Sequence, residues 1–137
     1  MIIRLDHVAI VVKDLARALQ FYTDILGFTV VQRRELPERV IVALHSGDAE
    51  IDLWWYRHEK AVNPTSKITD IGMKHVCFLV DDVQQIYTSM MEKGVKFRNP
   101  PARGGPLNRM LAYFTDPDGI EWQLIERTHQ PRKRANA

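Results

Sequence analysis

The stretch His7-Val-Ala-Ile-Val-Val-Lys-Asp14 returns 68 residues later as His75-Val-Cys-Phe-Leu-Val-Asp-Asp82. Apolar and β-branched residues dominate both copies, which predicts a short β-strand in each. Each strand leads to an aspartate, a residue that is favoured as the N-cap of a helix. The repeated order of strand, cap and apolar-periodic segment indicates that the chain contains an internal duplication.

Both copies continue in the same way. After the strand we expect a helix that ends at a glycine, Gly27 in the first copy and Gly94 in the second. Three further strands then complete a βαβββ module. The predicted strands are 5–12, 28–32, 40–44 and 49–56 in the first module and 75–80, 95–98, 109–114 and 119–126 in the second, with helices at 15–26 and 83–93.

The predicted fold class is therefore α+β, with tandem duplicated βαβββ modules forming a curved mixed sheet around a concave cleft that is suited to a ligand. We expect one domain over residues 1–127, with module 1 at about 4–57 and module 2 at about 72–127. A polar connection joins the modules, and residues 128–137 form a basic C-terminal tail.

Composition excludes several classes of protein. Apolar residues make up 45% of the 137 residues and charged residues 26%, which is typical of a globular protein. The formal net charge is only +2 with interspersed signs, so we expect no nucleic-acid partner. A membrane span needs about 18 consecutive apolar residues, and none occur, so we expect a cytoplasmic protein. Cys77 is the single cysteine and lies in an apolar run, which predicts a buried thiol in a reducing compartment.

A polar constellation repeats with the modules. Each module begins with a histidine, His7 or His75, and its last strand carries a polar side chain among apolar ones, Asp52 or Gln123. A polar group on an apolar strand face is costly unless it is paired or bound. Two imidazoles, a carboxylate and an amide oxygen suit a divalent Zn, Ni, Co, Mn or Fe ion with positions open to substrate. The predicted metal ligands are His7, Asp52, His75 and Gln123.

Longer motifs make a resemblance specific. The segments His7–Asp14, Phe21-Tyr-Thr-Asp-Ile-Leu-Gly27-Phe28, Gly72-Met-Lys-His75-Val76 and Asp116-Pro-Asp-Gly119-Ile-Glu-Trp-Gln-Leu-Ile-Glu126 resemble the vicinal oxygen chelate superfamily, which includes glyoxalase I, methylmalonyl-CoA epimerase, extradiol dioxygenases and bleomycin-binding proteins. The resemblance covers Leu5 to Glu126 and implies the same four ligands. In glyoxalase-like members the second and fourth ligands are usually Glu or Gln. Asp52 is therefore a shortened ligand, and the neutral Gln123 cannot act as a proton shuttle.

The resemblance implies a metal-dependent lyase, isomerase or epimerase that stabilises an enediolate or similar oxyanion of a small oxygenated metabolite or thiol adduct. The catalytic base is expected at Glu121 or Glu50, because side chains two apart on a strand share a face and lie about 6.6 Å apart. A solvated strand-end glutamate is the alternative for each. The alternative functions are a non-catalytic drug-sequestering resistance protein, a thiol transferase and an extradiol-type dioxygenase on the same fold.

Four further residues are candidates for substrate binding. Trp54 and Tyr56 share the face of Asp52 and could form an apolar wall, although core packing is an equal alternative. Arg103 and Arg109 lie in or next to a Pro- and Gly-rich loop over 98–109, and could hold a carboxylate or phosphate if that loop closes over a ligand. By analogy with such folds, we also expect a small-molecule substrate and a homodimer.

Overall fold

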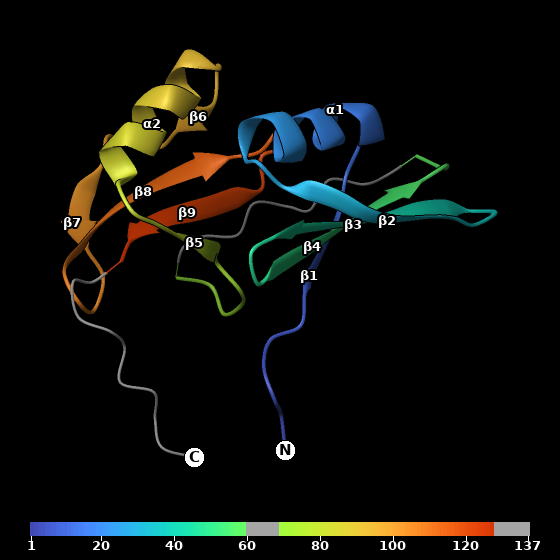
Figure 1. Cartoon of the computed structure of the whole chain (residues 1–137), viewed down its shortest axis with the longest axis horizontal. Coiled ribbons are helices and arrows are strands. Elements are labelled where there is room, and N and C mark those ends of the chain that lie inside the picture. Colours follow the sequence, from blue (N-terminus) through green and yellow to red (C-terminus); the bar gives the residue numbers. More distant parts are fainter. Residues whose placement is uncertain (60–68, 128–137) are drawn as a thin grey trace. The chain divides into compact units, whose positions relative to one another are not determined.

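In a computed structural model, which describes residues 1–59 and 69–127, the chain forms two compact units, one up to residue 67 and one from residue 68. Each unit has its own mixed sheet and helix, so the predicted α+β class and the repeated module are confirmed (Figure 1). The basic tail at 128–137 and most of the predicted connection lie outside the described residues. The assignment of both modules to one domain and the cleft stay predictions. No helix in the described part of the chain is long and apolar enough to cross a membrane.

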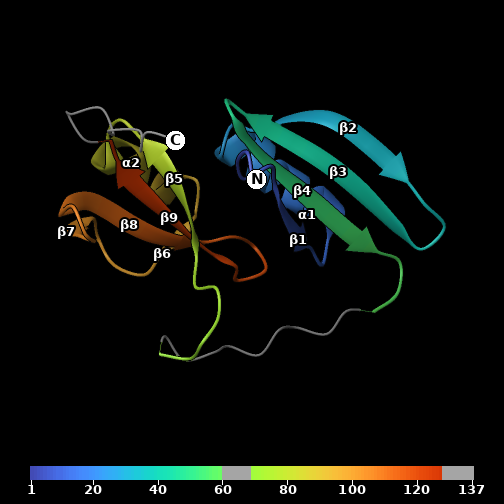
Figure 2. The same cartoon turned by 90° about the horizontal axis from the view of Figure 1, so that it is seen from below.

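The first unit is a four-stranded sheet with one helical segment. Its strand order is β1-β4-β3-β2, in which β1 runs parallel to β4 and the other neighbours are antiparallel (Figure 2). The elements are β1 (Val8–Val11), α1 (Leu15–Gln20), the π-helical segment η1 (Phe21–Ile25), β2 (Thr29–Glu35), β3 (Arg39–Ser46) and β4 (Ala49–Tyr56).

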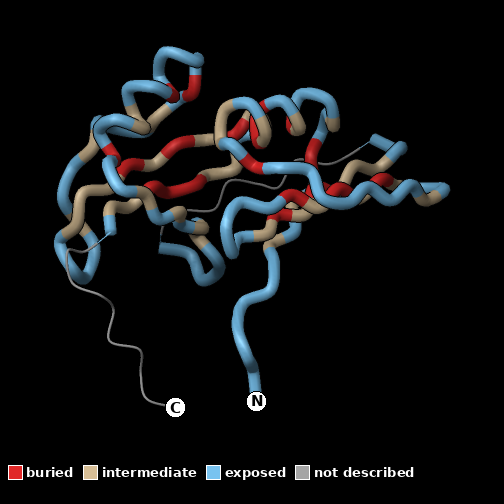
Figure 3. Tube along the Cα trace, viewed as in Figure 1, coloured by how far each residue is buried: buried red, intermediate tan, exposed pale blue. Residues whose placement is uncertain are grey.

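Alternation along β3 and β4 divides the first sheet into two faces. Val40, Val42, Leu44, Ile51 and Leu53 are all at most 2% exposed and form the core beneath α1 (Figure 3). Side chains with the opposite parity lie on the other face of the sheet, which we call the open face of the first unit. The core and the candidate site therefore use alternate residues of the same strands.

The second unit repeats this plan. Its strand order is β5-β9-β8-β6, with β5 parallel to β9 and β7 paired to β8. Trp122 of β9 is 1% exposed and stacks on Phe78 with ring centroids 5.1 Å apart, which anchors the core of this unit. The elements are β5 (Val76–Val80), α2 (Val83–Glu92), β6 (Lys96–Phe97), β7 (Ala102–Gly104), β8 (Arg109–Thr115) and β9 (Glu121–Glu126).

Both predicted N-caps are confirmed. The Asp14 carboxylate accepts a hydrogen bond from the backbone N–H of Arg17 at 3.0 Å, and Asp82 accepts one from Gln85 at 3.0 Å. Each satisfies a backbone donor that the first helical turn leaves without a partner. The glycine after each helix has a positive φ, 79° at Gly27 and 83° at Gly94, as the predicted helix ends require.

The structure corrects three local expectations. The helix at 15–26 is α-helical only to Gln20 and continues as η1, where the Thr23 hydroxyl donates to the Leu19 carbonyl at 2.7 Å and competes for its backbone partner. The loop at 98–109 contains β7, because the residues after its prolines have backbone N–H groups that can pair with β8. Cys77 is exposed, because Val76 and Phe78 take the inner side of β5.

Candidate metal site

The first predicted ligand pair comes together within the first unit. His7 lies just before β1, and Asp52 lies in the middle of β4, where it is opposite Ala9 in the parallel register. The Nε2 atom of His7 is 3.6 Å from Oδ2 of Asp52. Two ligands of one ion, each about 2.1 Å from the metal, lie roughly 3 Å apart. A small rotation of either side chain would therefore let both atoms contact one cation.

A neighbouring carboxylate orients the His7 ring. Its Nδ1 is 2.8 Å from Oδ2 of Asp6, and this hydrogen bond is the main cause that raises the pKa of His7, with the charge of Asp52 contributing. When Nδ1–H donates to Asp6, the neutral ring presents the Nε2 lone pair toward Asp52. Carboxylates commonly hold metal-binding histidines in this way.

Asp52 is the member of this pair whose surroundings best suit a cation. Its side chain is 15% exposed, and its Oδ1 atom is buried with no hydrogen-bond partner among the described residues. Burial raises the pKa of Asp52, and the negative charge of Glu50 raises it further. A buried, unpaired carboxylate oxygen beside a histidine nitrogen fits a bound cation, because a cation offsets both the lost hydration and the repulsion.

Glu50 extends the cluster on the same face. Its Oε1 is 2.5 Å from Nε2 of His45, and its Oε2 is 3.8 Å from Nδ1 of His7. Asp6, His7 and Glu50 each bring one ligand atom within 4.8 Å of the others, which makes them a second group that could hold an ion, through Nδ1 instead of Nε2. Asp6 was not among the predicted residues. Neighbouring side chains on a strand point to opposite faces, which would separate Asp6 from His7, but β1 begins only at Val8 and this alternation does not hold before it.

The second predicted pair repeats the strand register of the first. His75 lies just before β5. Gln123 of β9 lies opposite Cys77 of β5, just as Asp52 of β4 lies opposite Ala9 of β1. Gln123 is only 6% exposed. The His75 ring packs edge-on against Tyr113, with centroids 5.3 Å apart. The structure thus gives both pairs the same relation to their strands.

The two candidate bases have different surroundings. Glu50 lies among histidines and Asp52, as described above. Glu121 forms an ion pair with Arg98, whose guanidinium carbon also lies 4.5 Å from the centroid of the Tyr113 ring. Glu121 is held by Arg98, whereas Glu50 shares its strand face with Asp52, so Glu50 is the candidate that lies beside the predicted ligand pair of the first unit.

The predicted substrate-binding residues fall into two groups. Trp54 and Tyr56 lie on the open face of the first unit, and Arg39 stacks on both rings. The two predicted arginines are tied to backbone oxygens of their own unit. Arg103 donates to the Asn108 carbonyl at 3.2 Å, and Arg109 donates to the Glu126 carbonyl at 3.2 Å.

A separate hollow lies on the other side of the first sheet. It has a volume of about 700 Å³, and its lining includes Arg17 of α1, Arg33 of β2 and Trp55 of β4. Trp55 has the parity of the core residues, so this hollow is on the opposite face from Asp52. It is not part of the candidate metal site.

The sequence of the chain matches one family of known proteins. A family model for the Glyoxalase/Bleomycin resistance protein/Dioxygenase superfamily matches residues 4–124. The chain is 33% identical over 132 residues to a probable chloroplastic lactoylglutathione lyase of Arabidopsis thaliana, covering 93% of this chain and 37% of that protein. It is 28% identical to mitochondrial methylmalonyl-CoA epimerase of Mus musculus, covering 84% of this chain and 67% of that protein.

Solved structures agree on the fold. A glyoxalase family protein from Enterococcus faecalis superimposes with a TM-score of 0.78 at 24% identity, covering 90% of this chain and 98% of that one. The chain spans between about a third and a half of the length of the plant lactoylglutathione lyases that it matches.

Proposed function

Because the chain belongs to the Glyoxalase/Bleomycin resistance protein/Dioxygenase superfamily, we propose that it is a divalent-metal-dependent enzyme of the lyase or isomerase type acting on a small oxygenated compound. The proposed ligands are His7, Asp52, His75 and Gln123. The observation that carries the proposal is Asp52, whose Oδ1 is buried without a partner while its Oδ2 lies 3.6 Å from a histidine nitrogen.

The names of the relatives support proton-transfer chemistry. One is called a lactoylglutathione lyase and another a methylmalonyl-CoA epimerase. A divalent ion bound by these ligands would polarise a substrate carbonyl, which makes a proton on the neighbouring carbon easier to remove. The residues of the chain must then supply a base for that proton.

We assign the base to Glu50. Gln123 cannot fill this role, because an amide does not accept a proton at neutral pH. Glu50 lies two residues from Asp52 on β4, so its side chain shares the open face and lies about 6.6 Å along the strand. His45 holds its Oε1 atom at 2.5 Å and thereby orients the carboxylate. Glu121, held by Arg98, is proposed as a secondary candidate.

Metal content tests the proposal. Elemental mass spectrometry of freshly purified protein should find about one Zn, Ni, Co, Mn or Fe ion per chain. His7→Ala and His75→Ala should each lose it. His58→Ala is the matched control, because His58 is exposed and its Nδ1 lies 2.8 Å from the backbone carbonyl of Glu59.

The outcomes separate the alternatives. If the parent protein binds none of these ions when it is loaded with each of them, the proposal of a metal-dependent enzyme is wrong. A drug-sequestering function is then the better proposal for this member of the family. If only His7→Ala loses the ion, the site belongs to the first unit alone, and His75 and Gln123 are not ligands. The same preparations, examined by light scattering, report on the predicted homodimer.

A further inference from the structure

We infer that the substrate carries a carboxylate at the end remote from its metal-binding oxygens, and that Arg39 selects for it. This inference rests on the proposed function, because it takes the His7 and Asp52 end of the face as the place of the reacting group. It adds a specificity residue that the sequence did not point to and a chemical class for the substrate.

Arg39 is held in place on the open face. It lies on β3 directly opposite Tyr56, and its Nη1 donates to the Tyr56 hydroxyl at 3.1 Å. Its guanidinium carbon lies 4.6 Å from the Trp54 ring centroid and 5.9 Å from that of Tyr56. Stacking and a hydrogen bond together restrict the long side chain, so little further freedom is lost when it binds an anion.

The Arg39 guanidinium has donors to offer. Within the described residues its one side-chain hydrogen bond goes to Tyr56, and a guanidinium has five N–H groups. Arg39 is half-buried, and the part of the chain that the structure describes brings no carboxylate to it within ion-pair distance. A planar pair of N–H donors without a carboxylate partner matches the two oxygens of a substrate carboxylate.

An apolar strip separates Arg39 from the proposed ligands. Val11 of β1 lies opposite Trp54 of β4 and is 47% exposed. Trp54 is also the second residue on this face with a buried polar atom, Nε1, that has no hydrogen-bond partner among the described residues. Asp52 and Trp54, which are neighbours on the open face of β4, therefore each have a buried polar atom that a bound ligand would satisfy.

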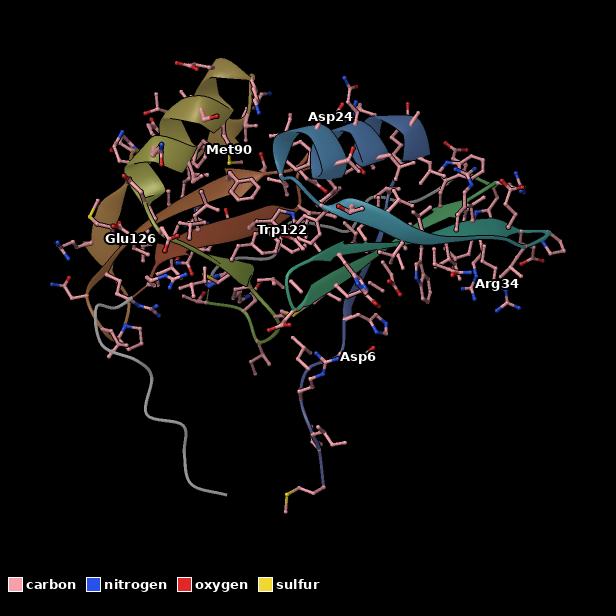
Figure 4. The ribbon with its side chains drawn as sticks, in the orientation of Figure 1. Asp6, Asp24, Arg34, Met90, Trp122 and Glu126 are labelled. Carbon is pink, nitrogen blue, oxygen red and sulfur yellow. The ribbon has the colours of Figure 1, made fainter. Side chains whose placement is uncertain are left out.

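Charge is also divided along this face. Acidic groups and histidines gather at the Asp52 end, whereas Arg39 and Arg34, which lies opposite Ile41, are at the other. Figure 4 shows the labelled Asp6 and Arg34 on the side of the first unit away from the helix that carries Asp24. A molecule that lies along this face would have one end at the proposed cation site beside Asp52. Its other end would lie at the positively charged Arg39 and Arg34.

The spacing limits the length of the substrate. Asp52 and Trp54 are about 6.6 Å apart along β4, and the Arg39 guanidinium carbon lies 4.6 Å from the Trp54 ring centroid. A substrate carboxylate therefore has to reach from Asp52 only to the next side chain on this face, so we expect a short spacer of about two carbons between its two adjacent oxygens and its carboxylate. A larger thiol adduct would need its acidic group at the same separation.

Two hydroxamates of equal length test this inference. Succinic monohydroxamate and butyrohydroxamate both chelate metals through adjacent oxygens, and only the first ends in a carboxylate. Isothermal titration of the Ni-loaded protein should show about tenfold tighter binding of the succinic compound, the effect of one partly exposed charge-assisted contact. Arg39→Met should abolish this preference and leave the affinity for butyrohydroxamate unchanged. Arg33→Met, on the opposite face and paired with Glu35 at 3.0 Å, is the matched control and should keep the preference.

Each result decides one claim. Equal binding of the two hydroxamates to the parent, or a preference that survives Arg39→Met, overturns the role of Arg39 and leaves the metal site standing. If neither hydroxamate binds a protein shown to contain metal, the open face is not the substrate site. If the protein takes up no metal, the proposed function itself fails, and that failure is seen before any hydroxamate is added.

Discussion

Replacing Asp52 with asparagine should make the metal-free protein more stable at neutral pH, although it removes a proposed ligand. The ionised side chain has one oxygen buried without a partner and lies near the negative charge of Glu50. Asparagine keeps a polar atom at the buried position, so the gain comes only from removing the charge, which ends both the repulsion by Glu50 and the cost of burying an ionised group. Because Asp52 keeps 15% exposure and loses the attraction of His7 at 3.6 Å, we take this gain as about 1 kcal/mol. For a chain of this size that corresponds to a rise in Tm of roughly 3 °C.

The pH dependence of this gain follows from the direction of the pKa shift. The pKa of folded Asp52 is raised above its ordinary value of 3.8, so ionisation is harder in the folded than in the unfolded chain. The cost is therefore fully present above the raised pKa, shrinks as pH falls through it and vanishes below about 3.8, where both states are protonated. The advantage of Asp52→Asn should fade over the same interval.

Urea unfolding of EDTA-treated protein, at a series of pH values from about 8 down to about 4, measures this difference. Asp24→Asn is the control. It removes the same charge, but Asp24 is exposed and lies on the helical side of the first unit (Figure 4). The reasoning is refuted if Asp52→Asn is no more stable than the parent at neutral pH. It is also refuted if the gain is the same at every pH or equals that of Asp24→Asn.

Two further predictions concern the second unit. Trp122→Ala should lower the free energy of unfolding by about 3–5 kcal/mol in urea titrations, because Trp122 is 1% exposed and stacks on Phe78. A loss smaller than that of an average surface substitution would contradict the place of Trp122 in the core. Asp82→Ala should cost about 1 kcal/mol through loss of the α2 N-cap, whereas Asp81→Ala, which removes only an exposed ion pair with Arg127, should cost much less, and equal losses would argue against the cap.

Much of the fold could be predicted because it depends on local rules. The caps at Asp14 and Asp82 and the helix-ending Gly27 and Gly94 follow from the chemistry of single positions. The two-residue period of strands predicts which side chains share a face, and the duplication checks each assignment against its copy. The contrast between Ile51, which is 2% exposed, and Asp52 on the open face required no more than this.

What could not be predicted depends on contacts between distant segments or on exceptions to a period. The pairing of β7 with β8 satisfies backbone groups in a segment whose prolines and glycines predict a loop. Arg39 was missed because it stands 15 residues from Trp54 in the sequence, and only the antiparallel register of β3 and β4 brings its side chain over that ring. Asp6 falls inside the predicted strand 5–12, where neighbouring side chains point to opposite faces, whereas the observed β1 begins only at Val8 and leaves Asp6 free to contact His7.

The two modules keep the same register but differ in charge, and this difference bears on where the chemistry takes place. Opposite the residue that lies two positions beyond the histidine, the first module presents an ionisable carboxylate, Asp52, with Glu50 two residues away on the same strand. The second presents the amide of Gln123, and its neighbouring carboxylate, Glu121, is paired with Arg98. If both modules contribute ligands, the second supplies neutral donors, while the acids, the proposed base and the stacked Arg39 all belong to the first. The duplicated backbone thus accounts for the symmetric positions of the proposed ligands, and the different side chains on the open face of the first unit account for the asymmetry of the proposed reaction site.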